Sequence, residues 1–124
     1  MNKLLIVDDS STMRKIIKRV LRQADIVIEN ILEAANGIEG LEQLAAHPDI
    51  ALVLSDVNMP EMNGLDFVKK VREEKTKEQL PVVMVTTEGG DEMVTNALES
   101  GANGYVTKPF TPESIKNVLD PFCS

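Results

Sequence analysis

Three aspartates stand where two apolar stretches of the sequence end. Asp8 and Asp9 directly follow the apolar residues 4–7, and Asp56 closes the segment ALVLSD. Carboxylates that lie close together repel one another and disfavour each other's ionisation, and a hard dication such as Mg²⁺ resolves that conflict. A carboxylate can also act as a nucleophile that forms an aspartyl phosphate. The three acids therefore predict a metal-assisted phosphoryl-transfer site if the fold brings them together.

A lysine and two threonines add the remaining groups that such chemistry needs. Thr86 and Thr87 follow the apolar run VVMV, and Lys108 follows the segment GYVT. A phosphoryl group in transfer needs its oxygens neutralised, which a metal ion, an ammonium and a hydroxyl supply. Each residue alone also has an ordinary structural explanation, because acids favour helix starts, threonine suits strands and lysine suits exposed loops. Only their combination at one end of one sheet indicates function.

The segments that must position these residues alternate between extended and helical patterns. The expected strands cover residues 3–7, 30–34, 51–55, 82–86 and 104–107. The expected helices cover residues 11–23, 37–46, 64–74, 91–100 and a segment that starts near residue 111. Apolar residues of the second helix, Ile38, Leu41 and Ala45, are expected to be buried. The last helix should start with Thr111 as N-cap and be short, because Pro121 should end it.

Five strand–helix repeats predict a parallel sheet with helices on both faces. The first, third and fourth strands are nearly continuous apolar runs, whereas the second and fifth are mixed, as edge strands are. The expected fold class is therefore α/β, a flavodoxin-like (βα)5 doubly wound parallel sheet in a three-layer sandwich. Its strand order, 2-1-3-4-5, is one of the known doubly wound orders. Such sheets bind ligands beyond the carboxyl ends of the strands, where the aspartates stand.

Composition narrows the possible functions. The 124 residues are 43% apolar and 27% charged, which predicts one globular domain over residues 1–124 with no output domain. The formal net charge of −7 argues against binding to nucleic acid or anionic membranes, and the longest apolar run is too short to span a bilayer. Cys123 and His47 are the only residues of their kinds, which excludes an intrachain disulfide and multi-histidine metal sites. A cytoplasmic protein is expected.

Four motifs together resemble the receiver domains of two-component response regulators. They are IVDDSSTMRKII, LVLSDVNMPEMNGLDFVKKVR, VVMVTTE and GYVTKPFT, and the resemblance covers essentially the whole chain. It implies a signalling switch, rather than a turnover enzyme, that a histidine kinase phosphorylates on Asp56 with Mg²⁺ as cofactor. The role expected first is chemotaxis through control of the flagellar motor. A phosphorelay intermediate or a phosphate sink in another pathway stays open as the alternative.

The resemblance also implies a role for each site residue. Asp9 and Asp56 would ligate Mg²⁺ through their side chains and Asn58 through its backbone carbonyl, while Asp8 would act largely through water. Lys108 would contact the phosphoryl oxygens.

The remaining implied roles concern the switch and its kinetics. Thr86 would hydrogen-bond to the phosphoryl oxygens, and Tyr105 would move inward when Thr86 is drawn to them. The Lys108–Pro109 peptide bond is implied to be cis. Thr87 is bulkier than the usual family residue, which predicts slower hydrolysis of the phosphorylated form.

Two surfaces are expected to bind partners. The first helix carries five basic residues and no acid within residues 11–23, and the family's kinase or phosphotransfer domain docks there; the basic residues are Arg14, Lys15, Lys18, Arg19 and Arg22. The family's output surface is formed by the fourth helix, fifth strand and fifth helix, which here include Val94, Leu98 and Tyr105. A flagellar motor switch protein is its expected partner, and the chain is expected to be monomeric.

Three other functions use parts of the same pattern. A phosphatase of the haloacid dehalogenase type needs a second acid two residues after its nucleophile, where this sequence has Asn58. A flavodoxin-like flavin carrier needs a phosphate-binding loop after the first strand, where two carboxylates would repel a phosphate. A receiver that has lost phosphorylation and serves only as a scaffold is disfavoured, because all the required side chains are present.

Overall fold

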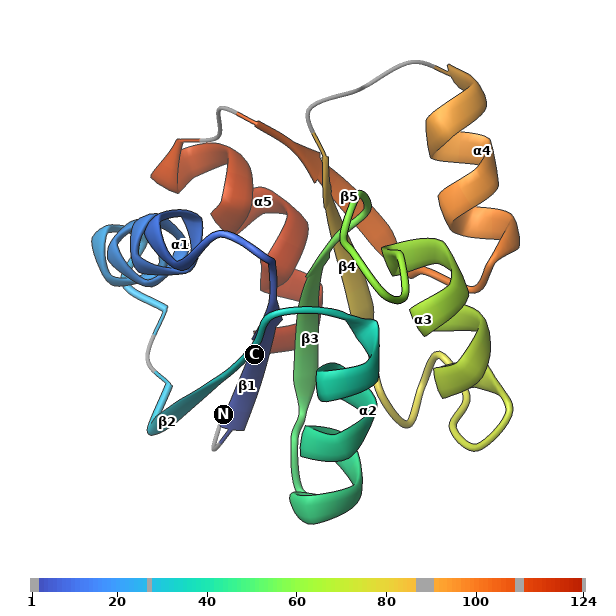
Figure 1. Cartoon of the computed structure of the whole chain (residues 1–124). Helices are drawn as coiled ribbons and strands as arrows, with labels where there is room; N and C mark the ends of the chain where they lie inside the picture. The colour runs from blue at the N-terminus through green and yellow to red at the C-terminus, as the bar shows by residue number, and fades with distance from the viewer. Residues whose placement is uncertain (1–2, 27, 87–90, 109–110, 124) are drawn as a thin grey trace.

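The computed structural model of the chain describes residues 3–26, 28–86, 91–108 and 111–123 (Figure 1). The strands are β1 (Lys3–Val7), β2 (Asn30–Ala34), β3 (Leu52–Asp56), β4 (Val82–Thr86) and β5 (Gly104–Thr107). The helices are α1 (Ser11–Gln23), α2 (Gly37–Ala46), α3 (Gly64–Arg72), α4 (Asp91–Glu99) and α5 (Pro112–Cys123). Strand and helix positions expected from the sequence are confirmed to within two residues, and Asp56 is the last residue of β3.

The strands form one parallel sheet in the order β2-β1-β3-β4-β5, as expected. In Figure 1, α1 and α5 lie on one face of this sheet and α2, α3 and α4 lie on the other. The three-layer sandwich is therefore confirmed. The side on which successive strands are added to the sheet changes between β1 and β3, and the loops at the carboxyl ends of these two strands open onto the same rim of the sheet.

Side chains alternate between the two faces along each central strand. Leu5 and Val7 of β1 pack with Phe67 on the side of α2 and α3, whereas Leu4 and Ile6 pack with Ile17 on the side of α1 and α5. β3 and β4 divide their residues in the same way. Burial on both faces explains why these strands read as continuous apolar runs.

The helix ends follow local chemistry that the sequence carries. The side chains of Ser10, Asn36 and Asn63 accept backbone N–H groups in the first turns of α1, α2 and α3. Gly101 has φ 112° and ends α4: its N–H donates to Leu98, and the next N–H donates from Ala102 to Ala97. Thr111 also caps α5, as expected, because its hydroxyl accepts the N–H of Ser114 at 3.1 Å.

The expectation that Pro121 ends the last helix is wrong. α5 runs for 12 residues, from Pro112 to Cys123, with Pro121 inside its final turn. Ile115 and Leu119 of this helix are fully buried, and Phe122 packs against the same core. Continuing the helix past Pro121 places Phe122 on that core. The burial of Phe122 outweighs the hydrogen bond that proline cannot donate.

α2 packs against the core through Leu41, as expected, and through two glycines, which corrects part of a second expectation. Ile38 is 45% exposed and Ala45 is also exposed, although both were expected to be buried. Gly37 and Gly40 face inward instead, and a Cβ atom on Gly40 would lie 2.8 Å from the ring of Phe67. The close approach of the α2 backbone leaves Ile38 on the outer side of the helix.

Among the described residues, no helix is long and apolar enough to cross a bilayer.

Arg72 joins three segments at the amino-terminal end of β4 and β5. Its guanidinium donates to the carbonyls of Gly101, at 2.8 Å, and Leu80, at 2.9 Å, and to the side chain of Asn103. The Asn103 side chain in turn accepts the backbone N–H of Val82 at 3.0 Å. One partly buried arginine therefore connects the end of α3 to the start of β4 and to the turn before β5.

Candidate functional site

The three aspartates meet at the carboxyl end of the sheet. Val7 of β1 pairs with Ser55 of β3, so the residues that follow each of them, Asp8 and Asp56, end neighbouring strands. One carboxylate oxygen from each of Asp8, Asp9 and Asp56 lies within 4.8 Å of the others. Asp8 is 1% exposed and the Asp56 side chain 12%, whereas Asp9 is exposed. Exposure to solvent therefore increases within the cluster from Asp8 through Asp56 to Asp9.

Lys108 lies close to both Asp8 and Asp56. Its Nζ atom is 3.3 Å from an oxygen of Asp8 and 3.6 Å from an oxygen of Asp56. The Lys108 side chain is 13% exposed, and its backbone N–H donates to the carbonyl of Thr86 at 2.6 Å. The ammonium therefore neutralises part of the acid charge from a position fixed by the end of β4.

The pKa of Asp56 is raised by its surroundings. Burial raises the pKa of Asp56, and the charges of Asp8 and Asp9 raise it further. Lys108 and the backbone N–H of Val57, which donates to the Asp56 carboxylate at 2.8 Å, act in the opposite direction but do not cancel the rise in pKa. A cation bound among the three carboxylates would stabilise the ionised form that burial disfavours.

Hydrogen bonds hold Asp8 on all sides. Its backbone N–H donates to the carbonyl of Ala34 at 3.0 Å, and its carboxylate accepts the N–H of Ser10 at 2.9 Å. Its backbone carbonyl accepts a hydrogen bond from the Arg14 guanidinium. The sequence predicts the acid but not these contacts, because the Ala34 and Arg14 contacts depend on how β2 and α1 sit beside it.

The loop after β3 passes very close to the start of α3. Gly64 donates its N–H to the carbonyl of Val57 at 2.8 Å. A Cβ atom at position 64 would lie 2.1 Å from the carbonyl oxygen of Asp56. Asn58 is exposed in this loop, two residues beyond Asp56. Gly64 is a residue of the site's framework that appeared in the sequence analysis only as the start of an expected helix.

The residues expected to act as a switch lie on neighbouring strands. Thr86 is 2% exposed at the end of β4 and pairs with Thr107 of β5. Tyr105 lies two residues earlier on β5 and is 37% exposed. Thr87 and Pro109 lie outside the described residues, so the expectations of slow hydrolysis and of a cis peptide bond stay predictions.

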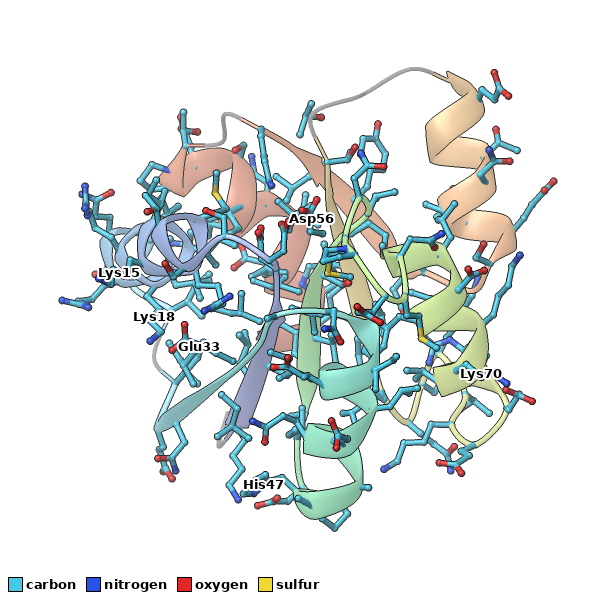
Figure 2. The ribbon with its side chains drawn as sticks, viewed as in Figure 1. Lys15, Lys18, Glu33, His47, Asp56 and Lys70 are labelled. Carbon is cyan, nitrogen blue, oxygen red and sulfur yellow. The ribbon has the colours of Figure 1, made fainter. Side chains whose placement is uncertain are left out.

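The basic helix α1 has two distinct sides. Arg14 and Lys18 pair with Glu33 of β2, at 2.8 Å and 2.6 Å. Figure 2 shows Lys18 directed toward Glu33 and Lys15 directed away from the sheet. Lys15, Arg19 and Arg22 are exposed and form no ion pair within the described residues. The five basic residues therefore divide into two that are paired with Glu33 and three that are exposed.

The fold and this acid cluster define a regulatory domain of bacterial signalling, and comparison with known proteins agrees. The chain belongs to the response regulator receiver domain family, which matches residues 4–120. It is 51% identical over 118 residues to the chemotaxis protein CheY1 of Helicobacter pylori, which covers 95% of this chain and 94% of that protein. It is thus a CheY-like response regulator in chemotaxis signalling.

Solved structures show the same fold. The chemotaxis response regulator CheY4 of Vibrio cholerae matches with a TM-score of 0.83 at 36% identity over 98% of both chains. The CheX–CheY–BeF3–Mg²⁺ complex of Borrelia burgdorferi matches with a TM-score of 0.84 at 26% identity, over 98% of this chain and 90% of that one. The order 2-1-3-4-5 is also the order known for CheY. Receivers of this kind are signalling switches that interact with histidine kinases and downstream targets.

Proposed function

We propose that Asp56 accepts a phosphoryl group in a Mg²⁺-dependent reaction and that the phosphorylated chain signals through a protein contact. The observation that supports this best is the cluster of Asp8, Asp9 and Asp56, with the ammonium of Lys108 beside Asp8 and Asp56. A nucleophilic carboxylate, two further acids for a metal and one fixed cation are the groups that phosphoryl transfer to a carboxylate requires.

The donor set fits Mg²⁺. Carboxylate oxygens are its preferred protein ligands, and Asp9 and Asp56 would hold it, with Asp8 acting through water and Asn58 through its backbone carbonyl. Burial and the charges of Asp8 and Asp9 raise the pKa of Asp56, and a bound cation would oppose that rise. When bound, Mg²⁺ would neutralise the acids together with the oxygens of the phosphoryl group.

The residues of the chain then perform the transfer. An oxygen of Asp56 forms a bond to phosphorus while the bond from phosphorus to the donor, a histidine nitrogen of the kinase, breaks. Lys108 leaves its acid partners to contact the phosphoryl oxygens. Thr86, buried at the neighbouring strand end, donates its hydroxyl to them. The chain promotes this step and the later hydrolysis without being a turnover enzyme.

The output surface comprises α4, β5 and α5. Leu98 of α4 and Tyr105 of β5 expose 42% and 37% of their surfaces and are therefore accessible to a partner; the side chain of Val94 lies outside the described residues. We propose that inward movement of Tyr105 changes the shape of this surface so that a flagellar motor switch protein can bind it.

In this proposal the chain acts as a cytoplasmic monomer that binds neither membranes nor nucleic acid. A phosphorelay intermediate or phosphate sink is the second candidate, and the CheX–CheY complex supports only a protein partner in general.

Phosphorylation with a small acyl phosphate tests the proposed site. In the presence of Mg²⁺, intact-mass measurement should show one phosphoryl group per chain, and peptide mapping should place it on Asp56. Removing Mg²⁺ with a chelator should reduce the labelling rate at least about 100-fold, because no dication is then left to neutralise the acids and the phosphoryl oxygens. Equal labelling with and without the metal would contradict the proposal.

A pull-down distinguishes the two output candidates. The chain is loaded with beryllofluoride and Mg²⁺, a mimic of the phosphorylated aspartate, and compared with the untreated chain. Retention of the flagellar switch protein only with the mimic would support motor control. Retention of a phosphotransfer domain and no switch protein would support the relay.

The two sides of α1 predict different effects on kinase docking. Reversing the exposed charge in Lys15→Glu should slow phosphotransfer from the kinase by roughly 10-fold at low salt, because this residue faces an incoming partner. Lys18→Gln should have a much smaller effect, since Lys18 is paired with Glu33. Stopped-flow phosphotransfer at two salt concentrations measures both. Equal effects of the two substitutions would contradict the division of α1 into two sides.

A further inference from the structure

The Asp9 carboxylate is the least restrained of the three acids. Within the described part of the chain, no hydrogen bond or ion pair holds it, and the residue is exposed. Asp8, by contrast, has partners for its backbone N–H, its carbonyl and both carboxylate oxygens. The direction of the Asp9 side chain therefore depends on the backbone that precedes it.

Arg14 holds that backbone. Its guanidinium donates to the carbonyl of Asp8, and this carbonyl belongs to the peptide group that joins Asp8 to Asp9. A peptide group is planar, so fixing its carbonyl fixes the plane from which Asp9 continues. The same guanidinium donates through Nε to Glu33 at 2.8 Å, which anchors it to the edge strand β2.

Glu33 is itself firmly placed. Its other carboxylate oxygen accepts a hydrogen bond from Lys18 at 2.6 Å, and its backbone carbonyl accepts one from Gln43 of α2 at 3.1 Å. The hydrogen bond from Lys18 lowers the pKa of Glu33, and Arg14 lowers it further against the effect of burial. The anchor therefore stays ionised at neutral pH and connects α1, β2 and α2.

We infer that Arg14 is a positioning residue for the metal site: with its anchor Glu33 it orients the Asp8–Asp9 peptide so that Asp9 faces the ion. This inference rests on the proposed Mg²⁺ site and assigns it a residue that does not touch the ion. Arg14 suits the role because its planar fork donates in two directions at once, which a single ammonium does less well.

The direction in which Mg²⁺ affinity changes when Arg14 is removed distinguishes a positioning role from a purely electrostatic one. Removing a positive charge near three carboxylates should strengthen the binding of a dication. Removing a residue that orients a ligand should weaken it, by roughly 10-fold for contacts of this kind. Lys18 provides a matched control, because it pairs with the same Glu33 but makes no contact with Asp8.

Calorimetric titration of the metal-free protein with Mg²⁺ tests the inference. Arg14→Ala should bind Mg²⁺ roughly 10-fold more weakly than the wild type, whereas Lys18→Ala should bind equally or more tightly. Arg14→Lys, which keeps the charge and is expected to fold, should still bind several-fold more weakly. Equal affinities in Arg14→Ala and Lys18→Ala, or wild-type affinity in Arg14→Lys, would overturn the inference.

Hydrogen exchange in the absence of metal provides a second readout. The N–H of Ser10 donates to the Asp8 carboxylate, and its exchange should become several-fold faster in Arg14→Ala but not in Lys18→Ala. Unchanged exchange in Arg14→Ala would also overturn the inference. A wild type that binds no Mg²⁺ would instead show that the proposed metal site is wrong, so the two failures are distinguishable.

Discussion

Asp56→Asn should abolish phosphorylation and at the same time stabilise the metal-free protein. An amide is not a nucleophile toward phosphorus, so labelling by a small acyl phosphate should fall at least about 100-fold, to the background of other side chains. The gain in stability has a separate cause. Burial and the charges of Asp8 and Asp9 penalise the ionised Asp56 carboxylate, and asparagine removes that charge.

The gain in stability should depend on pH with a defined sign. Because the pKa of Asp56 is higher in the folded protein than its ordinary value of 3.8, the folded state binds a proton first as the pH falls. The penalty is therefore present at neutral pH. It disappears as the pH drops through the raised pKa toward 3.8. Urea unfolding with a chelator present, at neutral and at acidic pH, should show the advantage of Asp56→Asn shrinking on acidification.

A matched substitution controls for the loss of one acid. Asp66 is exposed in the first turn of α3, where a negative charge favours the helix dipole. Asp66→Asn should leave labelling unchanged and should slightly lower stability. Two results would contradict the assignment of Asp56: full labelling of Asp56→Asn, or a stability gain in Asp66→Asn as large as in Asp56→Asn.

Gly64→Ala should destabilise the protein by about 3 kcal/mol or more, the largest stability effect expected of a single methyl group here. The added Cβ would lie 2.1 Å from the Asp56 carbonyl oxygen and 2.9 Å from the Cα of Val57. Both are backbone atoms, so the clash cannot be relieved by a change of rotamer. The loop or the helix has to move, and the hydrogen bond from Gly64 to Val57 is strained with it.

Gly104→Ala is the matched control. A Cβ atom at Gly104 would meet only the side chain of Val118, at 3.7 Å, which is an ordinary contact. Its free energy of unfolding should change by less than about 1 kcal/mol. Urea unfolding midpoints and slopes measure both variants. A cost for Gly64→Ala no larger than that for Gly104→Ala would show that the approach of α3 to Asp56 is not tight.

Much of the fold follows from patterns along the chain. Strands buried on both faces have to be apolar throughout, so β1, β3 and β4 are visible as continuous runs. Parallel strands end at one rim, which is why Asp8, Asp56 and Lys108 are predicted to converge although they are distant in sequence. The helix starts follow from side chains such as Ser10 and Thr111, whose capping bonds are local.

The expectations that failed depend on contacts between distant segments. Pro121 does not end α5 as its lack of an N–H predicts, because continuing the helix packs Phe122 against the folded core. Ile38 is apolar but exposed, because Gly37 and Gly40 let α2 approach the molecule through its backbone. The pairing of Arg14 with Glu33 depends on the position of β2 beside α1, and no spacing in the sequence identifies that one acid.

The arginine that joins α3 to the turn before β5 has a consequence for how a signal spreads. Arg72 and Asn103 hold the first residue of β4 and the residues before Gly104, at the end of the sheet opposite the aspartates. At the other end, β5 leads directly into Lys108, which a bound phosphoryl group would draw. If phosphorylation of Asp56 draws Lys108 as proposed, β5 is held at one end and pulled at the other. On that proposal the displacement would diminish from Thr107 toward Gly104, so Tyr105 would respond by rotation of its side chain rather than by translation of the strand.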